Sequence, residues 1–126
     1  MYNKKESVED YLEKVLMLEE QLDNIRAIDL AKFMSFSKAS VSVALKKLKS
    51  YGYLTVEEDT GFIHLTDSGR KIAKDTYERH ELIAESLMHI GVSKETALAD
   101  ACALEHIISE ETFNALKEVA KRRNNK

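Results

Sequence analysis

The chain has 126 residues, of which 44% are hydrophobic and 33% are charged. This length fits one ordinary domain or two very small ones, which argues against a multi-domain enzyme, and the apolar content is sufficient for a folded core. The formal net charge of −3 gives no overall sign of a nucleic-acid partner. No stretch approaches the ~20 apolar residues needed to cross a bilayer, and a single cysteine fits a reducing compartment, so we expect a cytoplasmic protein.

The absence of proline and the presence of only four glycines favour long helices, so we predict a mainly α fold. Ser7, with Asp10 three residues later, predicts the N-terminus of the first helix. The predicted helices are residues 8–21, 27–34, Ser37 to Gly52, Thr66 or Asp67 to about Ile90, Ser93 to about Ile107, and one starting at Ser109. Two β-prone runs, Leu54–Val56 and Phe62–Leu65, predict a hairpin that turns near Gly61.

A helix, a short helix, a turn, a third helix and a hairpin follow one another in the order of a winged helix-turn-helix, whose third helix can enter a DNA major groove. In that third helix Val41, Leu45 and Leu48 form an apolar stripe, and the opposite face is small and basic. Between Leu30 and Val56 there are several lysines and no carboxylate. The residues expected to face DNA are Ser37, Lys38, Ala39, Ser40, Ser42, Val43, Lys46 and Lys47. The alternative interpretation is a three-helix packing unit that binds nothing.

A second pattern consists of Cys102, Glu105 and His106. On a helix, positions i, i+3 and i+4 share one face, so a thiolate, a carboxylate and an imidazole would converge as ligands of a divalent transition metal. The plain alternative is a small buried cysteine beside ordinary helical neighbours. Asp10 and Glu13 are expected together on the first helix, on the side opposite its apolar stripe.

Four segments together resemble one known family. They are Ser7 to Glu13, the winged helix, Arg79-His80-Glu81-Leu82 and Cys102 to Ser109. The chain is similar to the diphtheria-toxin-repressor family of metal-activated repressors, in the short form typified by the manganese transport regulator. This resemblance implies a homodimeric repressor that binds Mn²⁺ or Fe²⁺ and then the operators of metal-uptake genes. The metal ligands that it implies are Asp10, Glu13, His80, Cys102, Glu105 and His106.

The chain departs from the family pattern in ways that bear on its metal. Cys102 stands where the manganese branch has glutamate, and Asp10 stands where the iron branch has methionine. A thiolate favours Fe²⁺, Co²⁺ or Zn²⁺, whereas carboxylates and imidazoles suit Mn²⁺ or Fe²⁺, so we expect Fe²⁺ first and Mn²⁺ second. The chain also ends before the extra C-terminal domain of longer members, so it is expected to act without one.

The expected wing tip, Glu57-Glu58-Asp59, is acidic, which argues against a strong wing contact with phosphates. We predict a DNA-binding domain at residues 1–70 and a helical metal-binding and dimerisation domain at residues 71–126. The apolar residues assigned to the dimer interface are Ala97, Leu98, Ala101, Leu104, Ile107, Ile108, Phe113, Leu116 and Val119.

Two other classes of function stay open. One is a metal-independent winged-helix regulator, or an adaptor that responds to a small molecule or a protein. The other is an enzyme in which Glu105 acts as general base beside a bound metal. Because the sequence has no nucleophile motif, phosphate loop or HExxH segment, we expect that the protein is not an enzyme.

Overall fold

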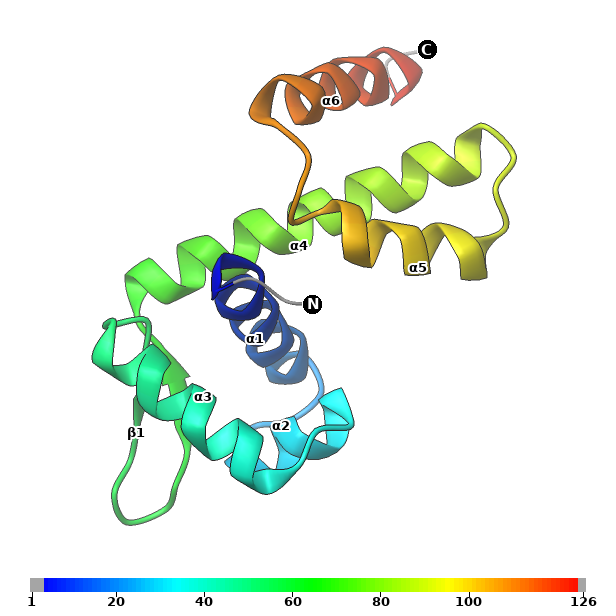
Figure 1. Cartoon of the computed structure of the whole chain (residues 1–126). Coiled ribbons are helices and arrows are strands. Elements are labelled where there is room, and N and C mark those ends of the chain that lie inside the picture. Colours follow the sequence, from blue (N-terminus) through cyan, green and yellow to red (C-terminus); the bar gives the residue numbers. More distant parts are fainter. Residues whose placement is uncertain (1–3, 125–126) are drawn as a thin grey trace. The chain divides into compact units, whose positions relative to one another are not determined.

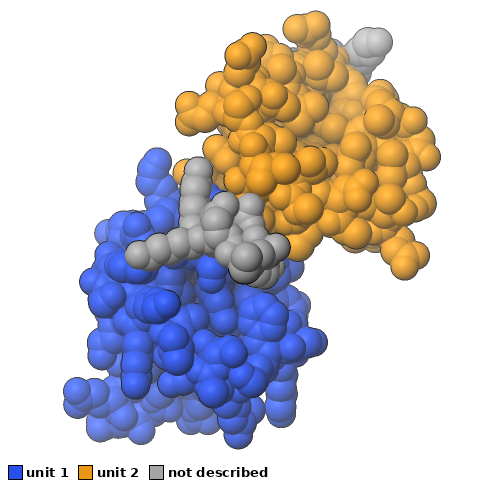
Figure 2. Space-filling model, in the orientation of Figure 1, with its two compact units in different colours: residues 1–74 blue, residues 75–126 orange. Residues whose placement is uncertain are grey.

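The computed structural model describes residues 4–124 and divides into two compact units, residues 1–74 and residues 75–126 (Figure 2). The outer limits of the two predicted domains, residues 1 and 126, lie outside the described residues. The elements are α1 (Lys4–Glu19), α2 (Ala27–Met34), α3 (Lys38–Ser50), β1 (Leu54–Val56), β2 (Ile63–Leu65), α4 (Asp67–His89), α5 (Lys94–Leu104) and α6 (Glu110–Asn124) (Figure 1). Within residues 4–124, no helix has both the length and the apolar character that a bilayer crossing requires.

Unit 1 is a winged helix-turn-helix, built from α1 to α3, the hairpin and the start of α4. Each element contributes an apolar stripe to one core. In α3 the stripe is Val41, Leu45 and Leu48, as predicted from their spacing. The strands pair antiparallel, with Leu54 opposite Leu65. The buried core residues are Tyr11, Leu12, Val15, Leu18, Ile25, Leu30, Ala31, Val41, Leu45, Leu48, Leu54, Ile63 and Ala73.

Several predicted helix boundaries are confirmed. Helix α2 has the predicted limits, and Ser37 caps α3, since its hydroxyl oxygen accepts a hydrogen bond from the Ser40 backbone N–H at 3.1 Å. Ser93 caps α5 in the same way through the Thr96 N–H. The hairpin turn includes Gly61 at φ +75°, a left-handed conformation that glycine adopts without a Cβ clash.

The limits of α1 were predicted incorrectly. The helix begins at Lys4, so Ser7 lies inside it and is not its N-cap. Lys4, Lys5 and Glu6 are good helix formers, which allows the helix to start before the serine. At the other end α1 stops at Glu19, before the predicted end at residue 21.

The end of α5 also differs from the prediction. The helix ends at Leu104, and Glu105 is its C-cap with helical φ and ψ values. The Ile107 and Ile108 N–H groups both donate to the Leu104 carbonyl, which satisfies the helix end and turns the chain toward α6. His106 therefore lies in a turn and not on the helix where the sequence pattern placed it.

The first turn of α4 lies directly against the segment that joins α3 to β1. The Thr66 N–H donates to the Tyr53 carbonyl, and the Thr66 and Ser68 hydroxyls donate to the Gly52 carbonyl. A Cβ built on Gly69 would lie 1.9 Å from the Tyr53 carbonyl oxygen. Glycine at this position is therefore a requirement of packing, because the atom in the way belongs to the backbone.

Unit 2 contains the rest of α4 with α5 and α6. Ile83, Ala84 and Ala101 form its small buried core. The Phe113 ring of α6 lies against the cations of Arg79 and Lys117, and Lys117 pairs with Glu78 of α4. Several residues expected at a dimer interface pack in or against this unit's own core or are buried, namely Ala97, Ala101, Leu104, Ile108 and Leu116. Others of that set remain exposed, namely Leu98, Ile107 and Val119.

Candidate functional site

The outer face of α3 carries all the residues that were predicted to face DNA. All eight, from Ser37 to Lys47, are exposed, while the inward stripe of the same helix is buried. The apolar side chain of Val43 on this face is 56% exposed. Ser37 donates a hydrogen bond to the Ser40 hydroxyl oxygen at 2.9 Å, so the hydroxyl hydrogen of Ser40 remains available as a donor. The face therefore offers methyl groups, hydroxyls and ammonium groups to a ligand.

The wing tip is exposed and acidic, as expected. Glu57 forms an ion pair with His64 of β2, and this hydrogen bond lowers the pKa of the Glu57 carboxyl. At neutral pH the tip carries three carboxylates, which repel a phosphate backbone. Within unit 1, the outer face of α3 thus carries exposed lysines, whereas the wing tip carries carboxylates.

Asp10 and Glu13 of α1 are buried, although the sequence pattern placed them on the side of the helix opposite its apolar stripe. Asp10 is 5% and Glu13 is 1% exposed, and both contact the Lys14 ammonium group, at 3.2 Å and 3.0 Å. Burial by itself would lower the pKa of Lys14, but the charges of Glu13 and Asp10 outweigh it and raise the pKa. The prediction did not include Lys14, although its spacing from Asp10 is that of a helical ion pair.

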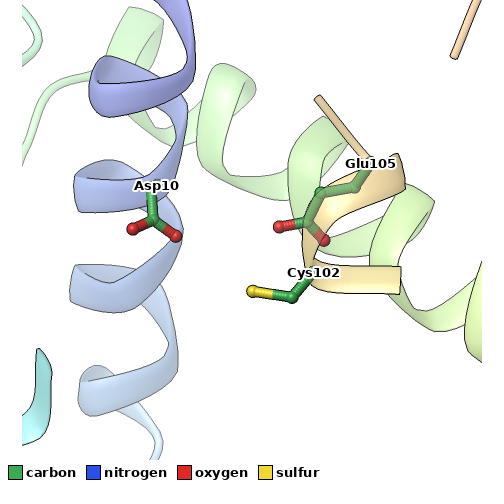
Figure 3. Close-up of side chains that lie close together, drawn as sticks. All are labelled: Asp10, Cys102 and Glu105. Carbon is green, nitrogen blue, oxygen red and sulfur yellow. The ribbon is translucent and has the colours of Figure 1, made fainter. Parts of the chain in front are cut away.

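Four of the predicted metal ligands meet in unit 2 around the carboxylate of Glu105. His80 Nδ1 of α4 lies 2.9 Å from one Glu105 oxygen, and His106 Nε2 lies 3.3 Å from the other. The Cys102 Sγ atom lies within 4.8 Å of a Glu105 oxygen. In Figure 3 the side chains of Cys102 on α5 and of Glu105, the C-cap of that helix, project to the same side, and Asp10 projects from α1.

The Glu105 carboxylate is completely buried, and within residues 4–124 neither of its oxygens accepts a hydrogen bond. The neighbouring imidazole nitrogens are close but do not have the geometry of hydrogen-bond donors to it. A buried carboxylate in this state is costly unless a cation neutralises it. Imidazole nitrogen, carboxylate oxygen and thiolate sulfur are together the donor set of a divalent transition metal, so the residues present fit such an ion.

Comparison with known proteins covers nearly the whole chain. Residues 5–62 match the model of the N-terminal DNA-binding domain of the iron dependent repressors, and residues 66–125 match the model of their metal-binding and dimerisation domain. The chain belongs to the iron dependent repressor family. These proteins are metal-dependent transcriptional regulators, which confirms the resemblance seen in the sequence.

Two curated relatives are similar to this chain over most of its length. The transcriptional regulator MntR of Escherichia coli O6:H1 is 33% identical over 115 residues, which cover 91% of this chain and 74% of the relative. The HTH-type transcriptional regulator MntR of Geobacillus kaustophilus is 36% identical over 113 residues, covering 90% of this chain and 77% of the relative.

Solved structures have the same fold. The metal-dependent transcriptional regulator MtsR has a TM-score of 0.83 at 28% identity, and the manganese regulator SloR has a TM-score of 0.79 at 30% identity. Each match covers 90% of this chain, which spans only 53% of the length of either solved chain. A further relative, ScaR, is described with bound Zn²⁺ at 30% identity. These solved relatives are thus described as metal-dependent or manganese regulators, and one of them with a bound divalent metal.

Proposed function

We propose that this protein is a homodimeric, metal-activated repressor that binds double-stranded operators of metal-uptake genes. Residues 1–70 bind DNA, and residues 71–126 bind metal and form the dimer. The observation that carries this proposal is the buried Glu105 carboxylate, surrounded by two imidazoles and a thiol, in the same chain as a winged helix. An operator-binding protein works beside the chromosome, so the cytoplasmic location expected from the sequence belongs to the same proposal. Glu105 then acts as a ligand, and the protein has no catalytic step.

The proposed metal ligands are Asp10, Glu13, His80, Cys102, Glu105 and His106. When bound, the metal supplies positive charge and fixed coordination to these side chains. Fe²⁺ suits a site that combines a thiolate with carboxylates and imidazoles, and is our first choice. Mn²⁺ is the second, and the manganese regulator among the similar structures supports it.

In the proposed mechanism, metal binding would restrain the distance between the two α3 helices of a dimer. Asp10 and Glu13 belong to unit 1 and the other proposed ligands belong to unit 2. An ion held by all of them would limit the separations that a dimer samples. Operator half-sites lie about one or more helical turns of ~34 Å apart, and a dimer held near that spacing binds better. A bound metal would change this equilibrium only through its higher affinity for the restrained state.

The proposed dimer interface includes the exposed apolar residues of unit 2 from the predicted set, namely Leu98, Ile107 and Val119. These side chains are not needed in the unit's own core. Their burial against a second copy would remove the apolar surface that a monomer leaves in water.

DNA reading is assigned to the exposed face of α3. In this proposal Ala39 and Val43 contact thymine methyl groups, while Lys46 and the serines form single hydrogen bonds. The face has no Arg, Asn or Gln for bidentate base contacts, so much of the specificity comes from DNA shape and half-site spacing.

Metal removal tests the proposed function directly. A duplex selected from random DNA in the presence of Mn²⁺ is titrated with protein, and binding is followed by fluorescence anisotropy. We expect EDTA to abolish specific binding and excess Mn²⁺ or anaerobic Fe²⁺ to restore it, because the metal-free dimer loses its restraint. Binding that EDTA leaves unchanged would instead support a metal-independent regulator.

Replacing Lys46 with alanine tests the DNA face. We expect weaker binding to every DNA sequence and a salt dependence that is shallower by about one counterion for each protomer, since one phosphate contact is lost. Lys94→Ala, which removes an exposed lysine at the start of α5, is the matched control and should leave both quantities unchanged. An unaltered salt slope in Lys46→Ala would mean that α3 does not face the DNA backbone.

A further inference from the structure

The positively charged end of Lys14 contacts the carboxylates of Asp10 and Glu13, as a bound metal cation would. Its ammonium group lies 3.2 Å from Asp10 Oδ1 and 3.0 Å from Glu13 Oε1. The Asp10 and Glu13 side chains are 7% and 1% exposed, and the Lys14 side chain is 20% exposed. The three groups lie within two turns of one helix, α1, which brings the ammonium group within reach of both carboxylates.

We propose that Lys14 is an internal competitor of the activating metal, and that it sets the metal concentration at which the protein responds. This inference rests on the proposed role of Asp10 and Glu13 as ligands. In the metal-free protein the single positive charge of the ammonium group offsets part of the negative charge of the two carboxylates. When a divalent ion binds, Lys14 moves its charge out to water and leaves the carboxylate oxygens to the metal.

The burial of the carboxylates makes this competition strong. An ion pair between exposed side chains contributes little, because water and salt screen it. Here both acceptors are almost completely removed from water, so their contacts with Lys14 are weakly screened. A metal must displace those contacts before it gains its own, and its apparent affinity is reduced accordingly.

Lysine is suited to this role because its charged end is only partly buried. The Lys14 side chain retains some exposure, so its flexible stem can carry the ammonium group into solvent without moving α1. The ammonium group stays protonated throughout, and no proton transfer is required. Because the same contacts are displaced for any ion, Lys14 lowers the affinity for all divalent metals by a common factor.

The test compares Lys14→Met with the unchanged protein by isothermal titration with Mn²⁺ and with Co²⁺, the latter as an air-stable substitute for Fe²⁺. We expect the variant to bind both ions about tenfold more tightly, by the same factor. We also expect the metal-free variant to unfold at a lower temperature, since two buried carboxylates then lack their cation. Lys14→Gln, which keeps a polar side chain without charge, should give the same direction if the methionine variant folds poorly.

Two further variants separate the possible outcomes. Lys49→Met removes an exposed lysine from the same unit and should leave metal affinity unchanged. Glu13→Gln should weaken metal binding if Glu13 is a ligand. An unchanged affinity in Lys14→Met, with weakened binding in Glu13→Gln, overturns the role of Lys14 but leaves the proposed site intact. If Glu13→Gln also binds metal normally, the ligand set itself is wrong, and the role of Lys14 is overturned with it.

Discussion

Replacing Glu105 with glutamine is expected to abolish metal-dependent DNA binding while both units remain folded. The Glu105 carboxylate lies between His80 and His106, close to the Cys102 thiol, and accepts no hydrogen bond within the described residues. Glutamine keeps the size of the side chain but removes its charge, so the proposed site would lose an anionic ligand for a divalent cation. We expect metal affinity to fall about 100-fold or more, measured by isothermal titration with Mn²⁺.

The folded state is expected to tolerate this change. An amide is less costly to bury than an ionised carboxylate, so the metal-free Glu105→Gln variant should have an unfolding temperature equal to or above that of the unchanged protein. Glu95→Gln is the matched control, because it alters the same charge at an exposed position of α5. The proposed centre is wrong if Glu105→Gln still binds DNA in response to Mn²⁺ at the original concentration.

Replacing Gly69 with alanine is expected to destabilise the winged helix by about 3 kcal/mol. Within a helix, alanine is normally favoured over glycine by about 1 kcal/mol, so propensity alone predicts the opposite sign. The added Cβ would lie 1.9 Å from the Tyr53 carbonyl oxygen and 2.8 Å from the carbonyl carbon. A backbone group cannot rotate away as the end of a side chain can, and this carbonyl also accepts the Thr66 hydrogen bond.

Urea unfolding of the metal-free protein, followed by circular dichroism, measures this effect. Lys74→Ala, at an exposed position later in α4, provides the control and should change the free energy of unfolding by less than about 0.5 kcal/mol. A Gly69→Ala variant as stable as the unchanged protein would show that α4 does not lie so close to Tyr53.

Much of the local structure was predictable because it depends on neighbours along the chain. The stripe of Val41, Leu45 and Leu48 repeats every three or four residues, which determines the buried face of α3. Ser37 and Ser93 cap helices by accepting hydrogen bonds from backbone N–H groups only three positions ahead, so their roles could be predicted from the sequence. The start of α1 was missed because Ser7 has the form of a cap, while the preceding residues are equally able to form helix.

The sequence by itself also contained the residue types of a metal centre, namely carboxylates, imidazoles and a thiol. Its resemblance to a family of metal-activated repressors indicated which of these residues to consider as ligands. Only the tertiary structure decided that Asp10 and Glu13 are buried and paired with Lys14, and that Glu105 lies between His80 and His106. It also decided that Gly69 lies against the Tyr53 backbone. The physical reason is that a helical repeat determines which side chains share a face, whereas burial and close approach depend on what residues distant in sequence place opposite that face.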